Sequence, residues 1–256
     1  MHPILLDSEF LGVPLRITSY GAAMALAIIV GWLLVSHFGR QRLPQAPWAD
    51  FYFGIILGGL LGAKLLLVVV RWPDLRSGAA SWGSVLAAGG IWLGGVLGAL
   101  VVGGWFVLRH RLPPARTADT LFLGLPLAHA IGRAGCLLTG CCYGDRCDLP
   151  WAIVYTDPAA QEIAGTPLGV PLHPSPAYEM VAELINFTVL LLLNRRRPAP
   201  GALAATWMAL YGSQRFMLEL LRGDDRGGLG LLSTSQWISV AMIASAAIFF
   251  WISRRR

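Results

Sequence analysis

Charged residues are scarce in this sequence of 256 residues. Asp, Glu, Lys and Arg together make up 13% of it, whereas 55% is hydrophobic and the mean hydropathy is +0.61. The apolar runs reach the roughly 20 residues that cross about 30 Å of hydrocarbon. This composition excludes an ordinary soluble domain. The net charge of +6 indicates no nucleic-acid function, because the arginines lie in short loops and at the C-terminus, where they set membrane topology.

The sequence also lacks a basic run ahead of its first apolar block. Residues 1–18 carry Asp7, Glu9 and Arg16 instead, so we expect an uncleaved span and no cleavable signal peptide. The apolar runs predict an all-α integral membrane protein with seven transmembrane helices, which would place the two termini on opposite sides. The predicted spans are 19–38, 51–70, 85–108, 118–138, 178–193, 201–221 and 235–252.

The distribution of arginine orients these spans. Cytoplasmic loops carry an excess of Lys and Arg, so the N-terminus should lie outside and the C-terminus in the cytoplasm. No internal repeat or low-complexity tract divides the chain, and we expect one domain over 1–256 with a small periplasmic cap at 139–177. The arginines predicted to be cytoplasmic are Arg40, Arg42, Arg109, Arg111, Arg116, Arg195, Arg196, Arg197, Arg254, Arg255 and Arg256.

Glycine is abundant inside the second and third spans. Small residues let helices approach closely in lipid, and close packing is the first interpretation of these glycines. The glycines of residues 87–95 allow a second interpretation. These glycines around Trp92 weaken a plain helix, and a broken or re-entrant segment lining a cavity would tolerate them.

Ionisable residues inside the spans are the chemically informative set, because an arginine at mid-bilayer costs about 2.5 kcal/mol or more. Such an arginine marks a functional site, or it neutralises an acid on a neighbouring helix, and for Arg133 both interpretations stay open. Spacings of three and four residues place most of them on shared helix faces, which should point at each other or at a hydrated cavity. A structural ion pair would explain two or three of them, but hardly a cluster with excess arginine. Three arginines suit a phosphate, whose oxygens the guanidinium fork binds bidentately. The set is Lys64, His129, Arg133, Glu179, Glu183, Asn186, Arg215, Glu219 and Arg222.

The four cysteines follow a C-x4-C-C-x4-C pattern at Cys136, Cys141, Cys142 and Cys147. Paired C-x2-C knuckles and a C-x2-C redox motif are both absent, so the spacing predicts no metal site. A disulfide between the adjacent Cys141 and Cys142 would be strained. We favour one or two structural disulfides, or free buried thiols, over a redox or metal role, and we expect no bound cofactor.

Several motifs in series resemble the prolipoprotein diacylglyceryl transferase family. The strongest are Gly-Arg-Ala-Gly at 132–135 with the turn that follows to Gly144, the segment from His173 to Glu179, and the segment from Tyr211 to Arg222. Each motif alone is weak, but their order and number cover nearly the whole chain. Weaker similarities are Tyr20-Gly21, Gly62-Ala63-Lys64, Gly94-Gly95 and Ser235-Gln236.

The resemblance implies a bacterial inner-membrane enzyme with its active site toward the periplasm. Such an enzyme moves the diacylglyceryl group of phosphatidylglycerol to the lipobox cysteine of a preprolipoprotein and leaves glycerol phosphate. By resemblance Arg133 and Arg215 would hold the phosphate, with Glu219 fixing an arginine and His129 as a further catalytic candidate. Tyr20 would orient the headgroup and Glu179 would order the cap. The expected substrate-binding residues are Tyr20, Lys64, Gly144, His173, Tyr178, Glu179 and Arg222.

The sequence departs from the family pattern at several positions. Cys136 and Thr139 stand where the family has asparagine, Cys141 stands where it usually has glutamate, and Leu93 replaces a histidine that is a natural proton acceptor. His129 is one substitute, although a lone helix histidine is often only hydrogen-bonded. His173 is the other, and it is alternatively a helix-entry residue.

These departures leave a second hypothesis open. The chain could be a family member without transferase chemistry, acting as a lipid-binding protein or in thiol-disulfide exchange, or a transferase with a changed acceptor.

Overall fold

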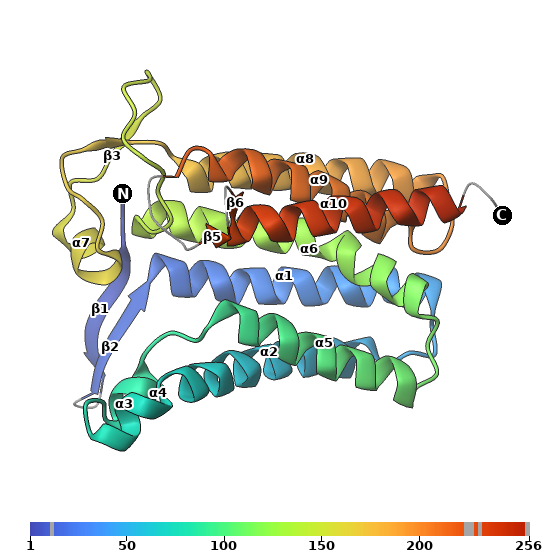
Figure 1. Ribbon diagram of the computed structural model, residues 1–256, viewed down its shortest axis with the longest axis horizontal. Helices are drawn as coiled ribbons and strands as arrows, with labels where there is room; N and C mark the ends of the chain where they lie inside the picture. Colours follow the sequence, from blue (N-terminus) through green and yellow to red (C-terminus); the bar gives the residue numbers. More distant parts are fainter. Residues whose placement is uncertain (11–12, 223–227, 230–231, 254–256) are drawn as a thin grey trace. The chain divides into compact units, whose positions relative to one another are not determined.

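The computed structural model describes residues 1–10, 13–222, 228–229 and 232–253, most of them in helices (Figure 1). The chain forms two compact units, Met1–Leu34 with Ala118–Arg256, and Val35–Thr117. Arg254, Arg255 and Arg256, which support the predicted orientation, lie outside the described residues. The expectation of one domain with a cap stays a prediction.

The first unit is a helix bundle in which α9 packs against both α8 and α10. An ion pair between Arg133 and Glu179 and a contact of His129 with Glu183 join α6 to α8. Most of α1 and of α6 belongs to this unit, and the short strands β1, β2 and β3 lie with α7 at one end of its helices (Figure 1). The long helices are α1 (Ser19–Arg42), α6 (Pro114–Thr139), α8 (Ser175–Arg195), α9 (Ala202–Glu219) and α10 (Thr234–Ser253). The short hairpin near the start of α10 consists of β5 (Gly228–Leu229) and β6 (Leu232–Ser233).

The N-terminal segment is a β-hairpin, which the all-helical prediction did not anticipate. Strands β1 (Ile4–Phe10) and β2 (Val13–Thr18) pair antiparallel, with Asp7 opposite Arg16. The Arg16 side chain also reaches outside the hairpin, where its Nη1 donates to Glu162 Oε1 at 2.8 Å. The β-branched residues of β2 were the available sequence signal.

We use the word cap for residues 140–174 between α6 and α8, which lie within the stretch 139–177 for which the sequence predicts a periplasmic cap. In it β3 (Ile153–Val154) pairs with β4 (Pro171–Leu172), and α7 (Pro158–Ala164) packs beside them. Tyr155 and Ala160 are buried in its core. Its periplasmic location stays a prediction.

The second unit is organised by a close contact between α2 and α5. A Cβ atom added at Gly98 would fall against the carbonyl oxygen of Gly58, and one added at Gly62 would lie 2.9 Å from Gly98 Cα. The close-packing interpretation of the glycines is therefore confirmed for this helix pair. The helices of this unit are α2 (Trp48–Val70), α3 (Trp72–Ser77), α4 (Trp82–Ala87) and α5 (Trp92–Arg109).

The predicted third span, 85–108, is broken as the second interpretation of its glycines proposed. Residues 88–91 separate α4 from α5, and the N–H of Ile91 donates to the carbonyl of Ala63 at 3.1 Å. Lys64 Nζ donates to the carbonyls of Leu86, at 2.7 Å, and Ala88. The ammonium group therefore satisfies carbonyls at the end of α4, as cations often do at helix C-termini.

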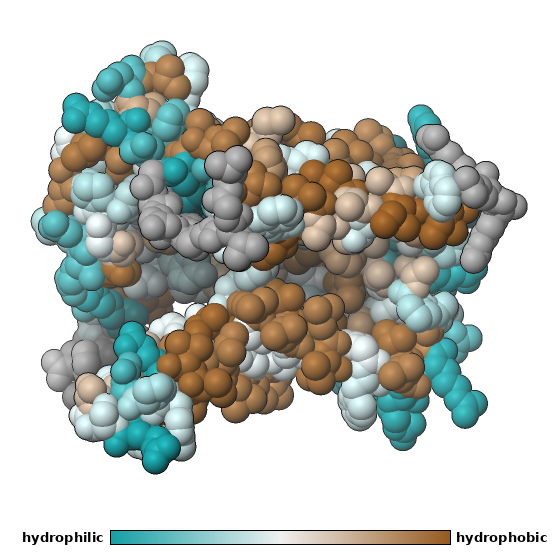
Figure 2. Space-filling view, viewed as in Figure 1, coloured by the Kyte–Doolittle hydropathy of each residue, from teal (hydrophilic) through white to brown (hydrophobic). Residues whose placement is uncertain are grey.

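Six described helices are long and apolar enough to cross a membrane. In Figure 2 hydrophobic residues cover the middle of the helices, and hydrophilic residues gather toward their ends. Helix α9 is not among the six, because polar residues such as Gln214, Arg215 and Glu219 lower its hydropathy. A multi-pass membrane protein is thus confirmed, whereas the seventh span and the orientation stay predictions. The six helices are α1, α2, α5, α6, α8 and α10.

The contact between α2 and α5 leads to a stability prediction. Gly98→Ala should destabilise the protein by about 1–3 kcal/mol, because the new methyl group overlaps the backbone of α2. Gly104→Ala in the same helix is the matched control, since nothing lies within 4 Å of its Cβ position. Thermal unfolding in detergent measures both variants. Equal unfolding temperatures would show that the glycine contact does not limit packing.

Candidate active site

The ionisable faces of α6 and α8 meet inside the first unit. Arg133 Nε donates to His129 Nε2 at 3.1 Å and lies 2.6 Å from Glu179 Oε2. His129 Nδ1 lies 3.4 Å from Glu183 Oε1. Both glutamates are buried, with 2% and 0% of their surface exposed. The prediction that these faces point at each other is confirmed.

Helix α9 extends this arrangement through Arg215. Its Nη1 lies 3.7 Å from Glu179 Oε1, and its Nη2 donates to Glu219 Oε2 at 2.6 Å and to Ser235 Oγ at 3.1 Å. Glu219 Oε1 accepts a hydrogen bond from Ser233 Oγ at 2.8 Å. The result is one connected series of buried or half-buried groups, which we call the polar chain: Glu183, His129, Arg133, Glu179, Arg215 and Glu219.

The charges of the polar chain correct one expectation from the sequence. Arginine is not in excess at these ion pairs, because Arg133 and Arg215 are matched by Glu179 and Glu219. The third arginine, Arg222, donates instead to the carbonyl of Cys142 at 3.4 Å. Counted with Glu183, the polar chain holds three carboxylates and two guanidinium groups, so each of these two arginines has a carboxylate partner.

Hydrogen bonding defines the state of His129. Arginine has no acceptor atom, so His129 Nε2 must accept from Arg133 Nε and carry no proton. The proton of the neutral ring then lies on Nδ1, which faces Glu183. A carboxylate behind a histidine fixes its tautomer and orientation in this way.

Two neutral residues of α9 hold Glu183, and the sequence analysis assigned neither of them. Trp207 Nε1 donates to its Oε2 at 3.3 Å, and Gln214 Nε2 donates to its Oε1 at 2.7 Å. Asn186 Nδ2 in turn donates to Gln214 Oε1 at 2.9 Å. Gln214 lies within the motif that begins at Tyr211, next to Arg215, and this position was the available signal.

Asp119 is a further residue that the sequence analysis missed. It is buried on α6 and accepts hydrogen bonds from the backbone N–H groups of Gly201, at 2.8 Å, and Ala204, at 3.0 Å. These are donors at the start of α9, which has no cap of its own. A carboxylate at a helix N-terminus stabilises the helix, so Asp119 sets the position of the helix that carries Arg215.

Several N–H donors of the arginines remain open. Among the described residues, Arg133 makes its hydrogen bond and ion pair through Nε alone, which leaves Nη1 and Nη2 able to donate. Arg215 Nη1 is buried without a hydrogen-bond partner in that same part of the chain. Glu179 Oε2 also accepts no hydrogen bond there despite its 2.6 Å distance from Arg133 Nε, because the N–H is directed at His129. These donors can bind the oxygens of an anion.

His173 and Tyr178 interact with each other and not with the polar chain. His173 Nδ1 lies 3.3 Å from the Tyr178 hydroxyl, which also accepts a hydrogen bond from Trp151 Nε1 at 2.7 Å. Tyr178 and Trp151 border an open apolar pocket of about 490 Å³. The other lining residues are Leu137, Ala152, Ile153, Pro174 and Ala177.

Gly144 and Tyr20 have different surroundings. A Cβ atom at Gly144 would lie 2.7 Å from His173 Cβ and 2.7 Å from the Leu221 carbonyl oxygen, so this position has no room for a side chain. The Tyr20 backbone N–H donates to Thr139 Oγ1 at 3.0 Å, while the tyrosine side chain is 40% exposed. Lys64 and Leu93 belong to the second unit, where Lys64 donates to carbonyls at the end of α4 and the Leu93 side chain is exposed.

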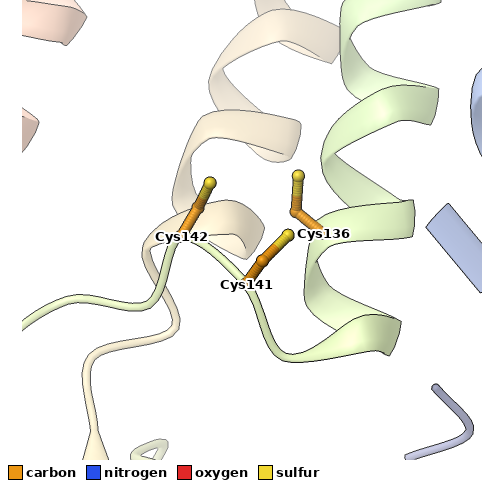
Figure 3. Close-up of side chains that lie close together, drawn as sticks. All are labelled: Cys136, Cys141 and Cys142. Carbon is orange, nitrogen blue, oxygen red and sulfur yellow. The ribbon is translucent and has the colours of Figure 1, made fainter. Parts of the chain in front are cut away.

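The cysteines are all free thiols, one of the two alternatives that the sequence favoured. The sulfur atoms of Cys136, Cys141 and Cys142 lie within 4.8 Å of one another (Figure 3). The pKa of Cys142 lies below the usual thiol range because the other two thiols hydrogen-bond to it, with a smaller contribution from the positive charges of Arg133 and Arg222. The linear spacing indicated no metal site, but this group offers three ligands.

Comparisons with known proteins agree with the motifs. A family model described as prolipoprotein diacylglyceryl transferase matches residues 9–252. Phosphatidylglycerol–prolipoprotein diacylglyceryl transferase 2 of Clostridium perfringens is 31% identical over 245 residues, which is 94% of this chain and 92% of that protein. The similarly named enzymes of Clostridium tetani and Symbiobacterium thermophilum are 30% and 32% identical, over 100% and 94% of this chain and 99% and 91% of their own lengths.

The buried network around Glu183 predicts a large loss of stability when its acceptor is removed. Glu183→Ala leaves the donor of the buried Trp207 unpaired, at a cost of about 1–3 kcal/mol, and it also removes the acceptor of the half-buried Gln214. Glu162→Ala, which removes an exposed carboxylate and with it the ion pair to Arg16, should change stability little. Thermal unfolding of both variants tests this. A Glu183→Ala protein as stable as the control would contradict the network.

Proposed function

Because this chain belongs to the prolipoprotein diacylglyceryl transferase family, we propose that it transfers the diacylglyceryl group of phosphatidylglycerol to a cysteine thiol of a prolipoprotein. The observation that carries this proposal is the pairing of Arg133 and Arg215 across Glu179, with guanidinium N–H groups still open in a buried setting. We place the enzyme in the bacterial cytoplasmic membrane, with seven spans, the N-terminus outside and the site toward the periplasm.

The open donors suit the phosphate of the lipid headgroup. Arg133 offers Nη1 and Nη2, and Arg215 offers Nη1, while their remaining contacts to Glu179 and Glu219 keep both side chains in place. Charge-assisted hydrogen bonds to a phosphate are strong, and arginine stays charged when it is buried. Donors that are already oriented need no reorganisation as charge develops during the reaction.

The chemistry is a displacement at carbon. The thiol sulfur attacks the glycerol carbon that carries the phosphate ester, the S–C bond forms and the C–O bond breaks. The electron pair of that bond leaves with glycerol phosphate, whose added negative charge Arg133 and Arg215 stabilise. Glu219 acts as a positioning residue for Arg215, together with Ser235.

We propose that His129 is the base that accepts the proton of the substrate thiol. A free thiol has a pKa of about 8.5 and needs a base to become a good nucleophile. The Nε2 lone pair of His129 is the only acceptor site of its neutral ring, and it is held by Arg133 Nε. A small tilt that passes the Arg133 Nε–H to Glu179 Oε2, 2.6 Å away, frees this lone pair and leaves Nη1 and Nη2 directed as before. Glu183 then supports the positive charge of the protonated ring from behind Nδ1.

The remaining residues are proposed to bind substrate. Tyr178 and His173 border the apolar pocket, which would accept an apolar segment of a substrate. Glu179 orders both arginines. The other proposed contacts are Tyr20, Lys64, Gly144 and Arg222.

Transfer of radiolabelled diacylglyceryl from phosphatidylglycerol to a lipobox peptide by the purified protein tests this function. Arg133→Ala and Arg215→Ala should each lower the rate by about 100-fold or more, as the loss of one donor to a developing anion does. Arg16→Ala is the matched control, because it removes an exposed arginine in the same unit. Full activity in Arg133→Ala and Arg215→Ala would refute the phosphate assignment, and an inactive wild-type protein would refute the proposed function.

The assignment of the base is tested separately with His129→Asn and His173→Asn. His129→Asn should lower the rate by about 100-fold or more and remove the corresponding limb of the pH–rate profile. His173→Asn should keep that limb, since its ring interacts with Tyr178. The opposite outcome would move the role of proton acceptor to His173.

A further inference from the structure

The end of α6 folds back on itself and brings three cysteines together. Gly140, with a φ of 94°, ends the helix. The N–H groups of Gly140 and Cys141 then both donate to the carbonyl of Cys136, at 2.9 and 3.1 Å. In Figure 3 the side chains of Cys136, on the helix, and of Cys141 and Cys142, on the turn, converge.

The cap holds this turn in place. Thr166 Oγ1 donates to the carbonyl of Gly140 at 2.9 Å, and the Tyr155 hydroxyl donates to the carbonyl of Leu137 at 3.1 Å. Cys142 has a φ of 60°, a left-handed conformation that costs a residue with a side chain about 1–2 kcal/mol. Surrounding contacts must maintain such a conformation, and it often accompanies a functional site.

We propose that Cys136, Cys141 and Cys142 bind one soft metal ion, Cu(I), through their three sulfur atoms. The sulfur atoms already lie within 4.8 Å of one another. Metal–sulfur bonds of about 2.3 Å in a trigonal arrangement separate the sulfurs by about 4.0 Å, so small rotations of the side chains complete the site.

The ligand set selects the metal. Thiolates favour Cu(I), zinc and iron–sulfur clusters. Structural zinc takes four ligands in a tetrahedron, whereas the group found among the described residues contains three sulfurs and no histidine or carboxylate. The buried Cys147 is not part of it. A three-coordinate soft ion therefore fits this site better than zinc does.

Neighbouring charges agree with this choice. Three thiolates around one Cu(I) leave two negative charges. Arg222 donates to the Cys142 carbonyl, and Arg133 precedes Cys136 by three residues on α6, so two guanidinium groups lie near the sulfurs. The ion would bind one helical turn from Arg133, yet the proposal does not depend on transferase activity.

A disulfide between two of these cysteines is the alternative to metal binding. It would leave the third cysteine unpaired, and a bond between the adjacent Cys141 and Cys142 would be strained. It would also require an oxidant. The test therefore counts thiols before the metal is added.

The free thiols of the purified full chain are first counted without reductant. Cu(I) is then titrated into the chain, under reductant and without oxygen, in competition with bicinchoninate. The wild-type protein should bind one Cu(I) per chain. Cys136→Ser, Cys141→Ser and Cys142→Ser should each weaken binding by at least about 100-fold, because even the loss of an outer-shell partner costs 10–100-fold. Cys147→Ser is the matched control and should bind as the wild type does. X-ray absorption should show three sulfur neighbours.

Four results would overturn the proposal. These are unchanged binding in the three cluster variants, equal weakening in Cys147→Ser, nitrogen or oxygen ligands in the absorption spectrum, and fewer than the four free thiols of the structure before metal is added. Thermal unfolding checks that each variant is folded. Should Cys136→Ser fail to fold because Cys136 is buried, the variants at the half-buried Cys141 and Cys142 decide the question.

Discussion

The buried carboxylate of Glu179 is the group on which the rest of the site depends. It lies on α8 with 2% of its surface exposed, between Arg133 of α6 and Arg215 of α9. A buried charge without partners costs several kcal/mol, so the three helices must keep the register that brings these side chains together. Asp119 supports the same register from the other end, because it caps α9.

This balance also explains how arginines can be held ready for an anion inside an apolar bundle. Glu179 and Glu219 neutralise Arg133 and Arg215 without using all of their donors. The guanidinium groups are therefore fixed in direction before a ligand arrives. Their open N–H groups lie in surroundings of low dielectric constant, where electrostatic interactions are stronger than in water.

Much of the fold follows from local patterns in the sequence. Long apolar runs predict helices because a helix satisfies its own backbone hydrogen bonds in lipid. Spacings of three and four residues predict that His129 and Arg133 share one face and Glu179 and Glu183 another. The glycines of 87–95 indicated the interruption before α5. The N-terminal hairpin was missed because its short strands carry no comparably strong periodic signal.

The sequence by itself determined the class of protein, the helices and the set of polar residues that enter them, because these depend on composition and on neighbours a few positions apart. Only the tertiary structure decided which charges pair, that the arginines are balanced, and that Trp207 and Gln214 hold Glu183. The cysteine cluster is likewise decided by the tertiary structure. Their spacing matches no metal pattern, and it is the fold of the turn at Gly140, held by contacts from a distant part of the chain, that brings three sulfurs together.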